Sequence, residues 1–226
     1  NGQIHVLTHY KNGKQDGLVT KWYESGQKES EGNLKNGKTE GFWAYWHKNG
    51  KKSIESNFKG GKPHGLSIAW YENGQKKLRV NFKDGRLDGL WTGWYENGKK
   101  RGERNYKKGR TDGFWISYYL NGNTEKSEIH KDGKLNGLKT EWYENGQKKL
   151  VGSLKDGKLD GLLTEWDEDG QKREERNYKD GNANGLLTNW HKNGQKARKG
   201  NYKDGKEDGL WIRYNEDGTE WGRYTF

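Results

Sequence analysis

The six histidines are the side chains of this chain best suited to proton transfer or to metal binding. A catalytic site is local, so its residues should interrupt any regular pattern. Four of the histidines instead replace a residue in columns that recur every 24 residues, namely a Tyr column, a Tyr and Phe column and an Asp column: His47, His191, His130 and His64. The other two, His5 and His9, are about 13 Å apart along one expected strand, too far for one metal. We therefore predict no catalytic residue and no metal site.

The acidic residues follow the same 24-residue step. One column flanks a glycine-containing turn and consists of Glu24, Glu72, Glu96, Glu144, Glu168 and Glu216. We interpret these as turn and solubility residues. No spacing typical of a phosphate-binding loop, a catalytic triad or a metal centre occurs. The sequence therefore indicates a non-enzymatic protein that needs no cofactor.

The basic residues suggest binding. The chain has 43 Lys and Arg against 32 Asp and Glu, a net charge of +11 that favours an anionic partner or surface. One lysine column consists of Lys11, Lys35, Lys59, Lys83, Lys107, Lys131, Lys155, Lys179 and Lys203, and a second of Lys28, Lys52, Lys76, Lys100, Lys148, Lys172 and Lys196. These lysines either keep the protein soluble and protect strand edges, or bind an acidic protein, an anionic glycan or lipid headgroups. Nucleic acid is a weaker candidate, because the rings that would stack on bases are expected to hold the repeats together.

One column of the repeat that contains four tryptophans has either a structural or a binding role. Trp43, Trp91, Trp115 and Trp211 share it with residues as different as Ser67 and Lys139. Such tolerance predicts either packing or projection into a groove that would suit a sugar ring or a partner's apolar side chain. Departures from the common pattern are concentrated in residues 113–136, where the candidates for a specific contact include Tyr118 and Tyr119. Together with the lysines from Lys35 to Lys203 in the first column, these aromatic residues are the candidate partner-binding residues.

The columns result from an internal repeat. Gly recurs at a constant 24-residue interval from position 17 to position 209, and two further glycine series keep the same step. We expect an opening half repeat at residues 1–16, nine repeats over residues 17–226, and one continuous repeat domain over residues 1–226.

Each repeat is expected to form a β-hairpin. Asn-Gly and Asp-Gly between alternating runs are strong hairpin signals. If the Asn-Gly turn has two residues, Glu72 faces Gln75 and Trp70 faces Lys77. The second turn, Lys83 to Gly89, contains two glycines and is expected to be longer, with a bulge or a wider loop. A glycine about every eight residues costs about 1 kcal/mol each inside a helix, which excludes a helical repeat.

Short turns make successive strands neighbours, so the predicted fold class is all-β, an elongated single-layer antiparallel meander. Nineteen strands at about 4.8 Å each would form a rod about 90 Å long. Only 27% of the residues are hydrophobic, which excludes a core with both faces of every element buried. We expect aromatic contacts between neighbouring repeats to stabilise the sheet.

The repeat resembles a known family. The unit Gly-x-Trp-x-x-Trp-Tyr-x-Asn-Gly-Gln-Lys, followed by Asn-Tyr-Lys-Asp-Gly-Lys-x-Asp-Gly, is similar to MORN repeats, and most similar to their bacterial second variant. The resemblance covers the whole chain. It implies an elongated sheet used for protein interaction or scaffolding, and in some members for contact with anionic membranes. The bacterial variant is often labelled an antitoxin or immunity component, and it also occurs on surface-associated proteins.

Three functions follow from these observations. The first is a non-enzymatic binding or scaffold module that contacts another protein. The second is a cell-surface adhesion module that binds an anionic glycan or a membrane surface, and the third is an antitoxin or immunity protein. Because residue 1 is not Met, we expect a processed chain or a piece of a longer one, and we favour a secreted or cell-surface location over a cytoplasmic one. Unpaired strands at both ends would permit end-to-end association of copies.

Overall fold

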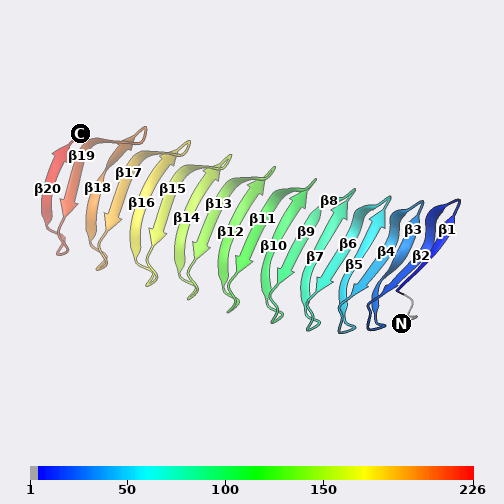
Figure 1. Ribbon diagram of the computed structural model, residues 1–226. Helices are drawn as coiled ribbons and strands as arrows, with labels where there is room; N and C mark the ends of the chain where they lie inside the picture. Colours follow the sequence, from blue (N-terminus) through cyan, green and yellow to red (C-terminus); the bar gives the residue numbers. More distant parts are fainter. Residues whose placement is uncertain (1–4) are drawn as a thin grey trace. The chain divides into compact units, whose positions relative to one another are not determined.

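The computed structural model describes residues 5–226, and within them the chain is all-β, with twenty strands and no helix (Figure 1). Residues 1–4 of the expected half repeat lie outside this range. The chain divides into two units, of which the first ends at Arg110 and the second begins at Thr111. The first unit contains β1 (Val6–Lys11), β2 (Lys14–Trp22), β3 (Lys28–Lys35), β4 (Lys38–Trp46), β5 (Lys52–Lys59), β6 (Lys62–Trp70), β7 (Lys76–Lys83), β8 (Arg86–Leu87), β9 (Gly89–Trp94) and β10 (Lys100–Lys107).

The second unit begins with β11 (Arg110–Tyr118), whose first residue is the last of the first unit. It continues with β12 (Thr124–Lys131), β13 (Lys134–Trp142), β14 (Lys148–Lys155), β15 (Lys158–Trp166), β16 (Lys172–Lys179), β17 (Asn182–Trp190), β18 (Lys196–Lys203), β19 (Lys206–Tyr214) and β20 (Glu220–Thr225).

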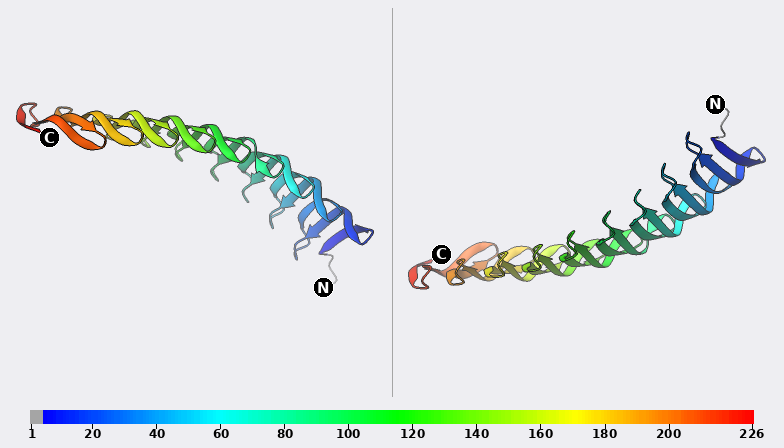
Figure 2. Two further views of the ribbon diagram at one scale, coloured as in Figure 1. Left: turned by 90° about the horizontal axis from the view of Figure 1, so that it is seen from above. Right: turned by 90° about the horizontal axis from the view of Figure 1, so that it is seen from below.

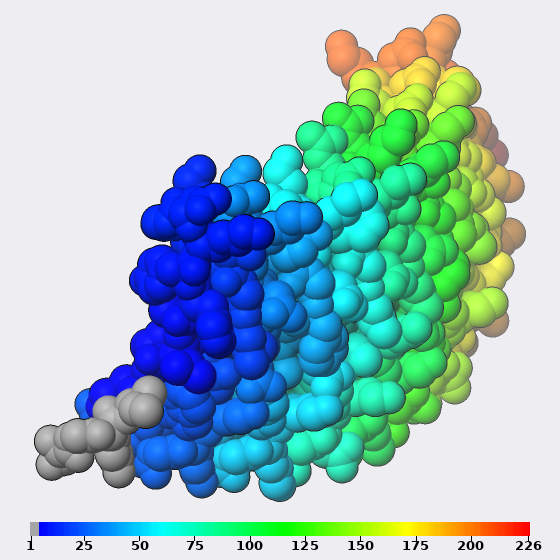
Figure 3. Space-filling model, turned by 90° about the vertical axis from the view of Figure 1, so that its right-hand side faces the viewer, coloured from blue at the N-terminus to red at the C-terminus, as the bar shows by residue number. Residues whose placement is uncertain are grey.

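Within each unit, every strand pairs antiparallel with its neighbour in sequence. The pairing runs from β1 to β10 in the first unit, where β7 pairs with both β8 and β9, and from β11 to β20 in the second. Each unit is one layer thick (Figure 2). In the space-filling view of Figure 3, the first unit appears as successive bands in sequence order, from blue to cyan. The predicted all-β antiparallel meander is therefore confirmed.

The lengths of the two connections in each repeat are the reverse of the prediction, although the bulge expected at the second connection is present. Lys83 pairs directly with Arg86, so the turn between them contains only Asp84 and Gly85. Both have positive φ, 51° and 81°, as a type I′ turn requires. Turns at the same place in the other repeats form one side of each sheet, the upper side in Figure 1, which we call the turn edge. A bulge follows the tight turn, as in the pairing of β14 with β15.

The Asn-Gly connection is the wide one. Tyr71 N–H donates to the Gln75 carbonyl at 2.9 Å, closing a five-residue loop, and Trp70 pairs with Lys76 and not with Lys77. Asn73 does not have positive φ, and its side-chain oxygen accepts the Gln75 N–H at 2.8 Å as an Asx turn. These loops form the opposite side of each sheet, which we call the loop edge.

The two faces of the sheets differ. On one face, which we call the packed face, large side chains lie over small ones on the next strand: a Cβ at Gly32 would come within 2.4 Å of the Trp43 ring, and one at Gly200 within 2.0 Å of the Trp211 ring. Aromatic contacts such as Trp43 with Phe58 and Tyr202 with Trp211 run along this face. The other face, which we call the leucine face, carries the Leu or Phe that follows each repeat glycine.

Candidate binding surfaces

A ladder of hydrogen bonds along the loop edge joins each loop to the next repeat. The Tyr71 hydroxyl donates to the Trp94 carbonyl at 2.9 Å, and the Asn73 amide donates to the Glu96 carbonyl at 2.8 Å. The second unit repeats the arrangement at Tyr119 and Tyr143 and at Asn121, Asn145 and Asn193. Burial raises the pKa of the Tyr143 phenol, and the nearby Asp167 charge raises it further. The Tyr and Asn columns therefore hold the repeats in register.

The histidines of these columns take the same structural positions. His47 Nε2 lies 3.0 Å from the Trp70 carbonyl and His191 Nε2 lies 2.9 Å from the Tyr214 carbonyl, where other repeats have a Tyr hydroxyl. His9 contacts the Leu18 carbonyl through Nδ1 at 2.9 Å. His47 and His191 thus bond a backbone carbonyl of the next repeat, and His9 bonds one of the neighbouring strand.

The turn edge is held by carboxylates of the preceding repeat. Asp88 accepts the Lys108 N–H at 3.1 Å, and Asp160 accepts the Asp180 N–H at 3.4 Å. Lys179 also lies 3.2 Å from Asp160, and its hydrogen bond, followed by that from the Asp180 N–H, lowers the pKa of the Asp160 carboxyl. In this column His64 replaces the Asp and approaches Asp84 at 3.4 Å.

The first predicted lysine column lies along the turn edge, and its side chains are exposed. Across most turns these lysines face a second basic residue: Lys35 pairs with Lys38, Lys59 with Lys62, Lys83 with Arg86, Lys131 with Lys134, Lys155 with Lys158 and Lys203 with Lys206, whereas Lys179 pairs with Asn182. Like charges directly opposite one another destabilise a strand pair. The stability of the fold therefore does not explain these opposed basic residues. Together they form a double row of cations along the turn edge.

The positive charge is concentrated in the first unit. Residues 1–110 contain 23 Lys and Arg against 11 Asp and Glu, a net charge of +12, whereas residues 111–226 contain 20 against 21, a net charge of −1. The same difference appears in the four-residue turn segments of the turn edge, such as Lys83 to Arg86. The five segments of the first unit hold 11 basic residues and one acidic residue, and the four of the second unit hold seven basic and four acidic residues. The turn edge of the first unit is therefore strongly cationic, and that of the second is only weakly so.

Lys108 is the clearest local departure in this edge. The other non-glycine residues with positive φ are Asn12, Asn36, Asp84, Asp132, Asp156, Asp180 and Asp204, types that tolerate this conformation, whereas Lys108 has φ of 52° without that advantage. Lys108, Lys62, Lys83 and Arg86 surround one hollow, together with the carboxylates of Asp84 and Asp88. Sequence reasoning identified Lys83 but missed Lys108, although Lys in place of Asn or Asp before a turn Gly was a readable signal.

The predicted tryptophan column lies in the packed face, and this corrects part of the prediction. Trp43 is 6% exposed and Trp211 is fully buried, so neither is accessible to a partner. They are buried because Gly32 and Gly200 leave room for an indole on the neighbouring strand, and because Arg198 lies over the Trp211 ring at 4.0 Å. Trp91 and Trp115 are half-buried, with Arg104 and Lys126 over their rings.

Residues 113–136 contain a charged cluster in the packed face. Glu128 is buried, with its carboxylate 3.0 Å from His130 Nε2 and 3.3 Å from Lys126 Nζ. His130 also contacts Thr111 and stacks beside Trp115. Tyr119, predicted as a contact, donates to the Trp142 carbonyl at 2.8 Å and belongs to the loop-edge ladder, while Tyr118 is half-buried at the end of β11. Sequence reasoning did not identify Glu128, which occupies the column of Gly32 and Gly200.

Four lysines of the second column are engaged in ion pairs within the leucine face, namely Lys28, Lys52, Lys100 and Lys172. Lys28 bonds Glu31 at 2.7 Å and lies over the Trp46 ring, and Lys172 makes the corresponding contacts with Glu175 and Trp190. The hydrogen bond from Lys28 lowers the pKa of Glu31. These lysines shield the tryptophans and are less available to a partner than those of the turn edge.

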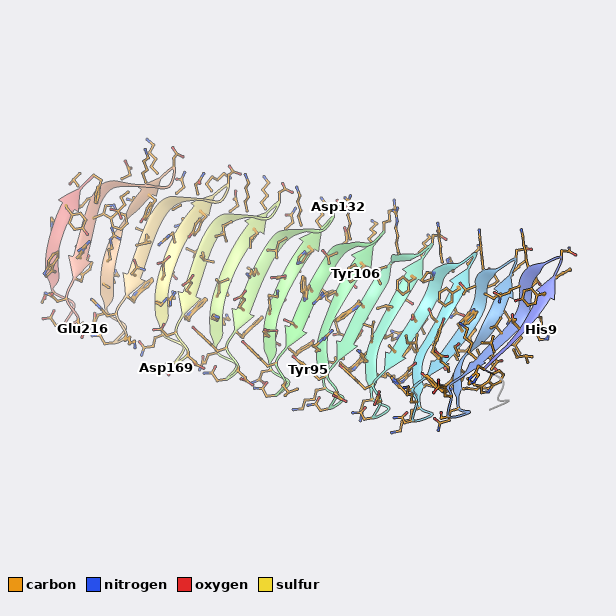
Figure 4. The ribbon with its side chains drawn as sticks, in the orientation of Figure 1. His9, Tyr95, Tyr106, Asp132, Asp169 and Glu216 are labelled. Carbon is orange, nitrogen blue, oxygen red and sulfur yellow. The ribbon has the colours of Figure 1, made fainter. Side chains whose placement is uncertain are left out.

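The described residues form neither a metal centre nor a membrane-spanning helix. Over residues 5–226, no three His, Asp or Glu side chains lie together as metal ligands would. The described residues contain no helix that is long and apolar enough to cross a membrane. Figure 4 instead shows charged side chains along the two edges, with Asp132 at the turn edge and Asp169 and Glu216 at the loop edge.

Comparison with known families identifies the repeat. A family model described as a MORN repeat variant matches residues 15–36, 63–84 and 87–108 in the first unit and residues 159–180 and 183–204 in the second. A comparison with curated proteins gives no match. Each matched segment begins within a strand that follows a tight turn and ends at the next tight turn, so it covers one hairpin and its Asn-Gly or equivalent loop. The chain therefore carries MORN repeats of the variant type in both of its units.

Proposed function

We propose that this chain is a binding module whose first unit holds an acidic protein surface along its turn edge. MORN repeats are a non-catalytic repeat type and generally serve as binding or scaffold modules. The observation that supports an acidic partner for the first unit is the difference in net charge, +12 in the first unit against −1 in the second on the same backbone. A need for solubility alone would not require one unit to carry all of the net positive charge.

The contacts within the turn edge support the same proposal. Its lysines face other basic residues across the turns, and Lys108 occupies a backbone conformation that other repeats give to Asn, Asp or Gly. Both features cost stability, and local costs of this kind are concentrated at functional sites. An acidic partner would neutralise the opposed cations and so recover that cost.

The test compares two variants with equal net charge. The first replaces Lys59, Lys83 and Lys107 by Gln, and the matched control replaces Lys131, Lys155 and Lys203, which occupy the same turn position in the second unit. Binding to a poly-glutamate peptide is followed by fluorescence anisotropy. Three exposed ion pairs of about 0.5 kcal/mol each predict an affinity loss of about tenfold for the first variant. The control should change the affinity much less.

Equal losses in the two variants would contradict the proposal, because they would mean that net charge alone determines binding. Heparin and vesicles containing phosphatidylserine serve as the competing probes. If either binds the wild type more tightly than poly-glutamate at the same ionic strength, the partner is an anionic glycan or a membrane and not a protein. Binding should weaken as salt is raised, since exposed charges are screened.

A further inference from the structure

The leucine face of the second unit carries an uncharged apolar row. The Leu or Phe of each repeat is 37–52% exposed at all five positions: Phe114, Leu138, Leu162, Leu186 and Leu210. In the first unit only two of the four corresponding side chains, Leu18 and Phe42, are comparably exposed. Within residues 111–226, each strand packs mainly against its sequence neighbours and no strand covers this face.

The residues directly opposite this row are uncharged too. Phe114 pairs with Ile129, Leu138 with Ser153, Leu162 with Asn177, Leu186 with Asn201 and Leu210 with Thr225. Ten consecutive positions across the sheet therefore carry no charge, in a chain in which 33% of residues are charged. We call these ten residues the leucine stripe. Six of the ten side chains are apolar, and an exposed row of large apolar side chains is typical of an interaction surface.

We propose that the leucine stripe binds the same stripe of a second copy of this chain, face to face and antiparallel. The spacing favours this occupant. Successive stripe leucines are two strands apart, about 9.6 Å, and a second copy repeats the same step. A partner helix would repeat its apolar pattern once per heptad, about 10.5 Å, so it would be out of step by about 4 Å after four repeats.

Charge also favours a second copy. The second unit has a net charge of −1, so two copies of it repel one another very little, whereas two first units at +12 would repel strongly. With Leu162 at the centre of an antiparallel pair, Asn177 of one copy lies opposite Ser153 of the other, and an amide and a hydroxyl can hydrogen-bond. An antiparallel arrangement with Leu162 at the centre places Leu138 opposite Leu186 and Phe114 opposite Leu210. The same surface is then used on both copies, as a two-fold dimer requires.

The first experiment compares matched double variants of the full chain by sedimentation velocity over the micromolar range. Leu138→Asn with Leu162→Asn removes two exposed leucines from the stripe, and Leu18→Asn with Phe42→Asn removes two equally exposed side chains from the first unit. We expect dimers in the wild type, dimerisation weakened by more than about tenfold in the first variant, and no change in the control. A monomeric wild type, or equal effects of the two variants, would overturn the proposal.

The second experiment tests the arrangement, using the absence of Cys in the chain. With Leu162→Cys, the two introduced thiols face one another across the two-fold axis, so mild oxidation should give a covalent dimer. Leu138→Cys alone should not, whereas Leu138→Cys combined with Leu186→Cys should. Cross-linking by Leu138→Cys alone would exclude the antiparallel arrangement. Because the measurement needs no partner, its result is independent of the function proposed for the first unit.

Discussion

The two units share one backbone pattern and differ in what they expose. In both, Tyr and Asn side chains of the loop edge bond carbonyls of the next repeat, and a Trp lies over a Gly in the packed face. Yet the first unit carries the whole net positive charge, and only in the second is the Leu or Phe of every repeat well exposed. A repeat thus needs only a few columns to maintain its register, and the remaining exposed columns are free to diverge.

This comparison separates two kinds of position. If the register columns act alike in both units, matched substitutions in them should cost the same in either unit. If the turn edge has diverged for binding, substitutions there should differ between units in sign or size. The predictions below test these two statements.

The largest effect is expected at the glycines beneath tryptophans. Gly32→Leu in the first unit and Gly200→Leu in the second each place a side chain where an indole lies within 2.4 Å. We expect each to lower the free energy of unfolding by about 3 kcal/mol, because the packed face cannot accommodate the added volume. Urea denaturation measures this. Gly222→Ala is the control, since a Cβ there meets nothing within 4 Å. A large cost in one unit only would show that the packed faces are not equivalent.

A smaller effect is expected from the hydroxyl ladder. Tyr71→Phe and Tyr143→Phe each remove a hydrogen bond of 2.9 Å to a carbonyl of the next repeat. We expect each to lower the free energy of unfolding by about 1 kcal/mol. Thermal or urea unfolding would show it, and faster amide hydrogen exchange should be confined to the repeats on either side. A neutral result for both would mean that water replaces the hydroxyl without cost.

The same ladder gives a pH dependence. Burial raises the pKa of Tyr119 and Tyr143, so the protonated phenol is favoured in the folded chain. The stability it contributes is complete below the unfolded pKa of about 10 and is lost as the pH rises through the higher folded value. Urea midpoints from pH 9 upward should therefore fall less steeply in Tyr143→Phe than in the wild type. If the urea midpoints of the two proteins fell equally steeply with pH, Tyr143 would not account for the pH dependence.

The smallest effect should have opposite signs in the two units. Lys108→Asp gives the first unit the residue found at Asp132, and Asp132→Lys does the reverse in the second, both at φ near 50°. We expect the former to stabilise the chain by about 0.5 kcal/mol and the latter to destabilise it by a similar amount, since Asp tolerates this conformation better. Lys108→Asp should nevertheless weaken poly-glutamate binding. If the variant gained stability and kept full affinity, Lys108 would not be part of the binding surface.

The sequence determined the repeat, the strands and their antiparallel order, because a 24-residue period with two turn signals leaves few topologies open. It did not determine which turn is tight. Asn73-Gly74 and Asp84-Gly85 both suit a type I′ turn, and the choice depends on hydrogen bonds between repeats: Asn73 bonds Glu96 in the next repeat and so acts as a loop residue. Local propensity contains no information about such a distant partner.

Burial in a single-layer sheet was also decided by the tertiary structure. A column that holds Trp43, Ser67 and Lys139 gives no sign of its depth, because what buries Trp43 or Trp211 is a glycine on the adjacent strand and, for Trp211, an arginine lying over it. The lysine column and its charge were readable from the sequence alone. That the net positive charge belongs to one unit became visible only with the unit boundary at Arg110. That the Leu or Phe of every repeat is well exposed only in the second unit also needed the tertiary structure, since strand pairing and not sequence distance sets which side chains share a surface.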